Sequence, residues 1–263
     1  MIVVSDARST VEVEAVGDAG VFVIRMQNPP VNALTPALVE GLGDALDQVV
    51  KEAARVIVVA SGVAGSFAAG ADIKTMVDVD HAGFVAYGRT VRAAVERLAA
   101  LDRPTIAAIE GNALGGGLEV ALACHLRVAG RDARLGLPEA KIGLIPSAGA
   151  TQRLPRVVGR GRALDLMLTA RAVKAEEALD IGLIDRLAEP GEAEADAVSL
   201  ATQVASLSIP ALMSEIRLVD AGFDLDLEAG LAREVAEVEA LLEGPDAREG
   251  MRAFVEKRRP RFQ

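Results

Sequence analysis

The sequence has few of the residues that cross-link a chain or bind a metal. Its 263 residues include one cysteine, two histidines, one tyrosine and no tryptophan. Because Cys124 has no second cysteine to pair with, an internal disulfide is excluded. His81 and His125 do not have the spacing of metal ligands. We therefore expect no metal site and a core that is aliphatic rather than aromatic.

The sequence also lacks a positive net charge and an uninterrupted membrane-length apolar run. The net charge of −10 argues against nucleic-acid binding, which needs a basic surface. The opening MIVVSDARST has neither the basic nor the long apolar segment of a secretory signal. The stretch closest to a membrane span, 105–124, holds Glu110, Glu119 and four glycines, a composition that favours a strand, a turn and a buried helix. We expect a cytoplasmic protein with no nucleic-acid or membrane partner.

The apolar residues that are present, 51% of the chain, follow an alternation of short strands and helices as far as residue 189. Strands are expected at 11–16, 21–26, 55–61, 105–111, 125–130 and 182–189, and helices at 38–50, 81–100, 117–123, 160–170 and 174–180. Residues 134–154 are expected to form a loop with one short strand. From Glu192 onward the pattern is helical, with breaks at Pro210, Gly222 and Gly244-Pro245. This order predicts an α/β core domain over 1–190 and a helical region over 191–263.

Two glycine-rich loops follow two of the predicted buried strands. They are SFAAGADIK (66–74) and GNALGGGLE (111–119). A loop between a strand and a helix presents backbone N–H groups without partners, so two neighbouring loops could direct two donors at one developing oxyanion. The alternative is that both are tight turns that allow close packing, and the glycine count alone does not separate the two interpretations.

Two carboxylates near these loops favour a chemical role. Glu119 lies in the first turn of the helix after the glycine triplet, and Glu139 follows Pro138. Either residue alone is typical of a capping acid, but the pair is suited to moving protons as an acid and a base. The helix N-terminus should lower the pKa of Glu119 and burial should raise it, and the sequence does not decide between them.

Four segments in this order and spacing resemble the enoyl-CoA hydratase/isomerase (crotonase) family, most closely its 2-enoyl-CoA hydratases. They are FAAGADIK (67–74), GNALGGGLE (111–119), LGLPEAKIGLIPSAGATQRL (135–154) and EGMRAFVEKRRPRF (249–262). The resemblance covers residues from about 11 to the end. It implies a spiral of ββα turns followed by C-terminal helices that build a homotrimer or a hexamer.

The resemblance also implies roles for individual residues. The N–H groups of Ala71 and Gly116 would hold the thioester oxygen of an acyl-CoA, Glu119 would take a proton from water, and Glu139 would deliver a proton to Cα. Contacts to the CoA and acyl portions would come from Ala33, Ala69, Asp72, Ile73, Lys74, Gly115 and Lys257. No metal or other cofactor is needed, because coenzyme A is part of the substrate.

The function implied is hydration of 2-enoyl-CoA thioesters in the breakdown of fatty acids or related acyl groups. A Δ3,Δ2-enoyl-CoA isomerase, or another acyl-CoA enzyme of the family, is the alternative, and a non-catalytic acyl-CoA or RNA-binding protein is a third. One departure affects the site: Ser147 and Ala150 replace glycines that are typical of the loop after Pro146. We expect this loop to reshape the acyl pocket or to shift Glu139.

Overall fold

The computed structural model describes residues 10–262. The expectation that no secretory signal is present concerns the first ten residues, and nine of these lie outside the described part. No single described helix is long and apolar enough to cross a membrane, although one bent pair of helices, Ala193–Ala205 with Ile209–Gly222, meets the length and composition required.

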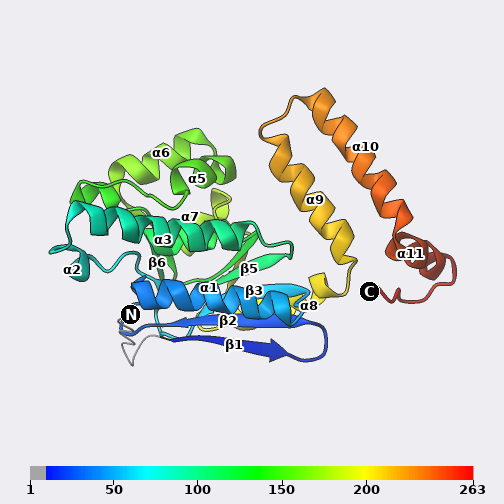
Figure 1. The fold of residues 1–263 in the computed structure, drawn as a ribbon, viewed down its shortest axis with the longest axis horizontal. Helices are drawn as coiled ribbons and strands as arrows, with labels where there is room; N and C mark the ends of the chain where they lie inside the picture. The colour runs from blue at the N-terminus through cyan, green and yellow to red at the C-terminus, as the bar shows by residue number, and fades with distance from the viewer. Residues whose placement is uncertain (1–9, 263) are drawn as a thin grey trace.

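Two sheets form the body of the molecule (Figure 1). The first has six strands in the order β1 (Thr10–Val16), β2 (Val21–Gln27), β3 (Val56–Ser61), β5 (Thr105–Ile109), β7 (Leu126–Gly130) and β10 (Arg186–Ala188). The second has four strands in the order β4 (Ser66–Ala68), β6 (Asn112–Leu114), β8 (Arg134–Gly136) and β9 (Ala172–Lys174). The β1–β2 and β8–β9 pairs are antiparallel and the remaining pairs are parallel.

Successive turns of the chain contribute one strand to each sheet. Strand β3 is followed by β4, β5 by β6, and β7 by β8, and each pair leads into helical structure. These helical segments are α2 (Ile73–Met76) with α3 (His81–Ala99), α4 (Gly116–Ala123), and a 3₁₀ helix (Glu139–Ile142) followed by α5 (Ala150–Val158) and α6 (Arg160–Thr169). The expected spiral of ββα turns is confirmed. Its consequence for function is that the short strands β4 and β6 lie side by side.

Helices cover both faces of the larger sheet. On one face lie α1 (Pro36–Lys51), which begins at a Thr35 cap, and α3. The spacing of apolar residues predicted α1, and its inward residues are buried: Leu38, Val39, Leu42, Ala45, Leu46 and Val49. On the other face α8 (Ala193–Ala205) buries four of its alanines and Leu200 against β3, β5 and β7. Helix α8 thus packs as part of the core, and the division expected at residue 190 stays a prediction.

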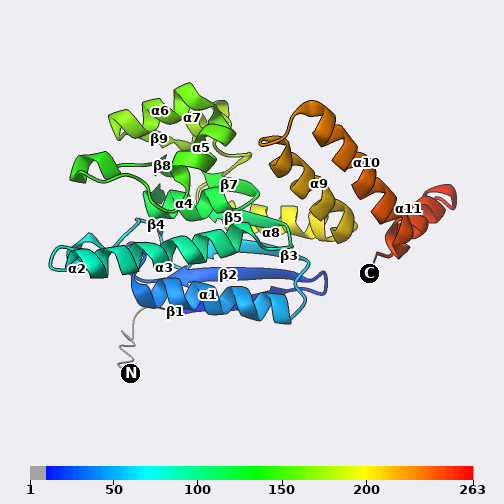
Figure 2. The ribbon, with the colours of Figure 1, turned by 45° about the horizontal axis from the view of Figure 1, so that its top comes forward.

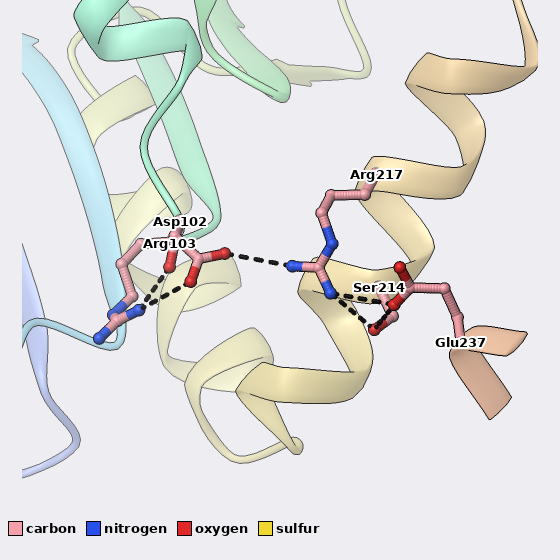
Figure 3. A network of polar contacts seen from close by, with 5 residues as sticks. All are labelled: Asp102, Arg103, Ser214, Arg217 and Glu237. Atoms are coloured by element: carbon pink, nitrogen blue, oxygen red, sulfur yellow. Dashed lines mark hydrogen bonds and ion pairs between the residues drawn. The ribbon is translucent and has the colours of Figure 1, made fainter. Parts of the chain in front are cut away.

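Three helices project from the body at its C-terminal end (Figures 1 and 2). They are α9 (Ile209–Gly222), α10 (Leu227–Glu243) and α11 (Pro245–Val255), and the first two end at or next to the predicted breaks. A polar network ties them to the core (Figure 3). Arg217 on α9 contacts Asp102 at 3.3 Å and Glu237 at 3.1 Å. Since these pairs are partly exposed, we expect them to orient the helices more than to stabilise them.

One helix, α5, lies where the sequence predicted a loop. Residues 150–154 were expected within a loop and 155–159 were assigned no element, but residues 150–158 form α5. The helix buries Ala150, Leu154 and Val158, which are spaced by one turn, but Pro155 lies inside it and concealed the pattern. Helix α7 (Ala175–Asp180), by contrast, was predicted almost to the residue.

We expect Gly111→Ala to destabilise the fold. Gly111 has a φ of +65°, and a Cβ there would lie 2.0 Å from the carbonyl oxygen of Gly65, which precedes β4. The combined strain and overpacking should lower the free energy of unfolding by about 2–5 kcal/mol. The measurement is urea unfolding at fixed protein concentration. Gly161→Ala on α6, where a Cβ meets nothing within 4 Å, serves as the control and should change stability by less than about 1 kcal/mol.

Candidate active site

Two backbone turns meet beside the second sheet. Residues 69–72 follow β4, Gly115 and Gly116 follow β6, and β4 and β6 are parallel neighbours. Gly70 has a φ of +82°, and a Cβ added to it would lie 3.1 Å from the Gly116 nitrogen. A Cβ on Gly117 would lie 2.1 Å from the carbonyl oxygen of Ala68. Only glycine allows this approach, so the glycines of both loops have a structural role that also brings two sets of amides together.

The amide of Ala71 is oriented by Leu34. The two residues form an isolated parallel bridge, in which the Leu34 N–H donates to the carbonyl of Gly70 at 2.8 Å. In a parallel bridge one residue bonds to the neighbours of its partner, so the partner's own N–H points away from it. Among residues 10–262, no backbone acceptor takes the Ala71 N–H. The group is therefore available to a ligand.

The amide of Gly116 is available for a different reason. Gly116 is the first residue of α4, and the first N–H groups of a helix have no partner within it. A Cβ on Gly116 would lie 4.0 Å from the nitrogen of Ala71, so the two turns that carry these amides are close neighbours. That the two N–H groups share one oxygen stays a prediction.

Asn32 holds the loop that carries Leu34. Its side chain is fully buried, and its Nδ2 donates to the backbone oxygens of Met26 and Phe67 and to Ser61 Oγ. Its Oδ1 accepts from the Asn28 N–H at 2.5 Å. Because these bonds reach the ends of β2, β3 and β4, the buried amide fixes the loop to the sheets without help from a ligand.

Glu119 is buried in the first turn of α4. The residue is 3% exposed, and its Oε1 accepts from the N–H groups of Ala148 at 2.7 Å and Ala150 at 3.1 Å. Burial raises the pKa of Glu119, while the amides of 147–150 and the charge of Arg153 oppose the shift. The net shift is upward, so burial decides the question that the sequence left open. These hydrogen bonds hold Oε1 of Glu119 against the loop 147–150.

Glu139 begins the 3₁₀ helix on the opposite side of the same space. Its Oε1 is 3.0 Å from the position of a Cβ on Gly115, and its buried Oε2 has no hydrogen-bond partner among the described residues. The pKa of Glu139 is raised to about 7, chiefly by burial and also by the charge of Glu119, while its own amide opposes the shift. A carboxyl with this pKa can hold or release a proton near neutral pH.

The two amides and the two acids line one cavity of about 450 Å³. Its other walls are mostly apolar side chains from two segments, α2–α3 and 142–145. These are Ile73, Met76, Phe84, Val91, Ile142, Leu144 and Ile145. A thioester oxygen between the amides would thus have its acyl chain in an apolar channel and its reacting carbons beside the acids. Among residues 10–262, no group of three or more potential metal ligands is clustered.

The predicted binding residues divide into three sets. Ala69, Ile73 and Gly115 line the cavity with the four catalytic candidates. Ala33, Asp72 and Lys74 do not line it, although each is adjacent in sequence to a lining residue. Lys257 follows α11, which lies at the opposite end of the molecule from α2 (Figure 1). Within one chain, Lys257 is not brought to this cavity.

Sequence reasoning missed the support given by the loop 147–150. We expected Ser147 and Ala150 to act on the acyl pocket or on Glu139, but the loop's amides bind Glu119 instead. Gly149 has a φ of +112°, and Arg153 Nη1 donates to the carbonyl of Ala148 at 2.9 Å. The hydrogen bond from Arg153 therefore holds the backbone of this loop. Ser147 does line the cavity, in agreement with the first expectation. Because every residue except proline has a backbone N–H, the residue types in this loop do not reveal that its N–H groups bind Glu119.

The chain is similar to known proteins over nearly its full length. A family model described as enoyl-CoA hydratase/isomerase matches residues 17–263. A probable enoyl-CoA hydratase of Bacillus subtilis is 39% identical over 93% of this chain and 96% of its own length. The human mitochondrial methylglutaconyl-CoA hydratase is 38% identical, with coverages of 88% and 70%. The crystal structure of an enoyl-CoA hydratase from Bacillus anthracis superposes with a TM-score of 0.91 at 36% identity, covering 96% of this chain and 98% of that one.

We expect Glu139→Gln to change how stability depends on pH. Between the ordinary glutamate pKa of 4.5 and its own pKa of about 7 in the folded chain, Glu139 keeps a proton that the unfolded chain has released. Stability conferred by that proton is complete below pH 4.5 and is lost as the pH rises to 7. The variant has no such loss, so its unfolding free energy relative to the parent should rise over this window by about 1–2 kcal/mol, allowing for partial exposure.

The measurement is urea unfolding at pH 4.5, 5.5 and 7.0. Glu40→Gln on the exposed side of α1 is the matched control and should show a constant difference from the parent. A constant difference for Glu139→Gln as well would contradict the raised pKa.

Proposed function

The chain belongs to the enoyl-CoA hydratase/isomerase family, and from this premise we propose that it adds water across the C2=C3 bond of 2-enoyl-CoA thioesters. The product is a 3-hydroxyacyl-CoA. The observation that carries the proposal is that Ala71, Gly116, Glu119 and Glu139 line one cavity. Hydration needs all four: two donors for the thioester oxygen and two acids for the two protons that move.

The amides act on the charge that forms during the reaction. When water attacks C3, the electron pair of the C2=C3 bond moves toward the thioester carbonyl, and its oxygen becomes negative. The N–H groups of Ala71 and Gly116 stabilise this enolate, and donors of this kind are typically worth about 2.7–4 kcal/mol each in the transition state. Because the donors are backbone atoms fixed by packing, they need little reorganisation as the charge develops.

The two acids divide the proton transfers. Ionised Glu119 accepts a proton from water as the C3–O bond forms. Protonated Glu139 gives its proton to C2, which completes addition of H and OH. A proton then passes from Glu119 to Glu139 to restore the starting state. The hydrogen bonds to Glu119 favour its charged form, and the unpartnered Oε2 of Glu139 favours the protonated form.

The pair of acids favours hydration over migration of a double bond. Isomerisation moves one proton between two carbons of the substrate, and one carboxyl is enough for that. The assay that separates the two reactions uses crotonyl-CoA for hydration and a 3-enoyl-CoA for isomerisation. Loss of the 2-enoyl absorbance with crotonyl-CoA supports hydration. Migration in the absence of hydration would assign the chain to the isomerases.

The proposal includes an assembly of three copies or of two such trimers. Helix α10 has no buried residue, and one stripe of it is apolar: Leu227, Leu231, Val235, Val238 and Leu242. Exposed apolar area of this extent is unusual on a monomer and is typical of an interface. A neighbouring copy could also supply Lys257 to a CoA phosphate. The absence of a resident cofactor and the cytoplasmic location expected from the sequence stay predictions.

Removing either acid should reduce turnover without removing binding. We expect Glu119→Gln and Glu139→Gln each to lower kcat by about 10²–10⁴, the range for general acid–base groups. The affinity for the 3-hydroxyacyl-CoA product, measured by calorimetry, should stay within a few fold because the amides and the apolar walls are intact. Glu40→Gln is the control and should keep full activity. Unchanged turnover in both acid variants would refute the assigned roles.

Placing charges in the apolar stripe of α10 should separate the copies. Leu231 and Val235 are 52% and 58% exposed in the single chain. By light scattering we expect the parent to have three or six times the chain mass of 27.3 kDa, and the double variant Leu231→Glu/Val235→Glu to have a lower mass. Val50→Glu, at an isolated valine that is 53% exposed, is the matched control. A parent that is monomeric would overturn the assembly.

A further inference from the structure

Tyr87 is the only tyrosine of the chain and its hydroxyl reaches the backbone beside the two amides. It lies on α3, is half-buried and lines the cavity. The hydroxyl donates to the carbonyl oxygen of Leu34 at 2.5 Å. Nothing in the proposed reaction uses this group, and a phenylalanine would fill the same volume.

Leu34 is the residue on which both donor amides depend. Its N–H binds the carbonyl of Gly70, and its bridge to Ala71 turns the Ala71 N–H away from it and toward the cavity. Its side chain lies against the other turn, since Leu34 Cδ1 is 2.9 Å from the position of a Cβ on Gly116. A small shift of Leu34 would therefore change the direction of one donor and the packing against the second.

We propose that Tyr87 is a positioning residue, whose hydroxyl holds Leu34 so that the N–H groups of Ala71 and Gly116 converge on one oxygen. This inference rests on the proposed function, because it assigns those amides to the thioester oxygen. The hydrogen bond links α3, which forms a wall of the acyl channel, to the backbone that polarises the substrate.

Tyr87 does not act as an acid or a base in this arrangement. Burial raises the pKa of Tyr87 to about 12, the Asp72 carboxylate acts in the same direction, and the Asp72 amide opposes it. The hydroxyl thus keeps its proton at neutral pH and donates it in a hydrogen bond. The hydrogen bond from Tyr87 to Leu34 either sets the direction of the two N–H groups or only attaches α3 to the rest of the protein.

Tyr87→Phe separates these two roles. If the two N–H groups no longer point at one oxygen, a transition-state interaction is weakened, so kcat should fall about tenfold while KM stays within about twofold. This loss is smaller than the fall in kcat of about 10²–10³ expected when a donor is removed outright. If the hydroxyl only fastens α3, the variant should lose thermal stability or raise KM and keep kcat. Thr90→Val is the matched control, because Thr90 Oγ1 bonds only to Ala86 within the same helix, and it should keep both constants.

A bound chromophore gives a readout that does not depend on turnover. The absorption of an aryl-conjugated enoyl-CoA, such as a cinnamoyl-CoA, moves to longer wavelength when hydrogen bonds polarise its carbonyl. We expect a clear shift on the parent and on Thr90→Val, and a smaller one on Tyr87→Phe at saturation. Equal shifts on all three, with kcat unchanged in Tyr87→Phe, would overturn the role of Tyr87. A parent that neither shifts the chromophore nor hydrates crotonyl-CoA would instead refute the proposed function.

If Tyr87→Phe does not fold, the parent itself can be tested, because fluorotyrosine incorporation labels this one position. The fluorine resonance should move more with a bound acyl-CoA thioester than with the thioether analogue that lacks the carbonyl. Equal movement with both ligands would show that Tyr87 senses only occupancy of the channel, and the proposal would fail.

Discussion

The site depends on the close approach of two main-chain turns that no side chain separates. Gly117 packs against the carbonyl of Ala68 at a distance that leaves no space for a Cβ, and Gly70, with a φ of +82°, lies tightly beside the Gly116 nitrogen. Since β4 and β6 are hydrogen-bonded neighbours, the sheet that builds the fold also sets the spacing of the donor amides. Catalytic geometry and core packing are therefore the same constraint in this region.

The two carboxylates lie in one cavity, but their hydrogen bonds favour different protonation states. Burial raises the pKa of both. Glu119 is compensated by two backbone N–H groups, which favour its charged form, whereas a buried oxygen of Glu139 has no partner among residues 10–262. The difference comes from the loop 147–150, which reaches one acid and not the other. The proposed proton donor and proton acceptor are thus distinguished by their hydrogen bonds and not by residue type.

Much of this arrangement could be predicted from the sequence. The glycine triplet and the glutamates at 119 and 139 were recognised from their residue types and positions. The spacing of apolar residues predicted α1 and α3 with small errors at their ends. The helix α5 was missed because Pro155 interrupts its pattern. The contacts of the loop 147–150 with Glu119, and of Tyr87 with Leu34, were missed for a more general reason. Each joins a side-chain oxygen to a backbone group far away in the chain, and the residue type that supplies the backbone group gives no sequence signal.

Most of the walls of the acyl channel come from segments outside the turns that carry the amides. Ile73, Met76 and Phe84 come from the α2–α3 segment and Ile142, Leu144 and Ile145 from the segment after Glu139. Several of these side chains are also exposed to solvent, so replacing them changes no buried packing of the spiral. Substrate range can therefore diverge among descendants of such a chain through these two segments while the reaction itself is inherited unchanged.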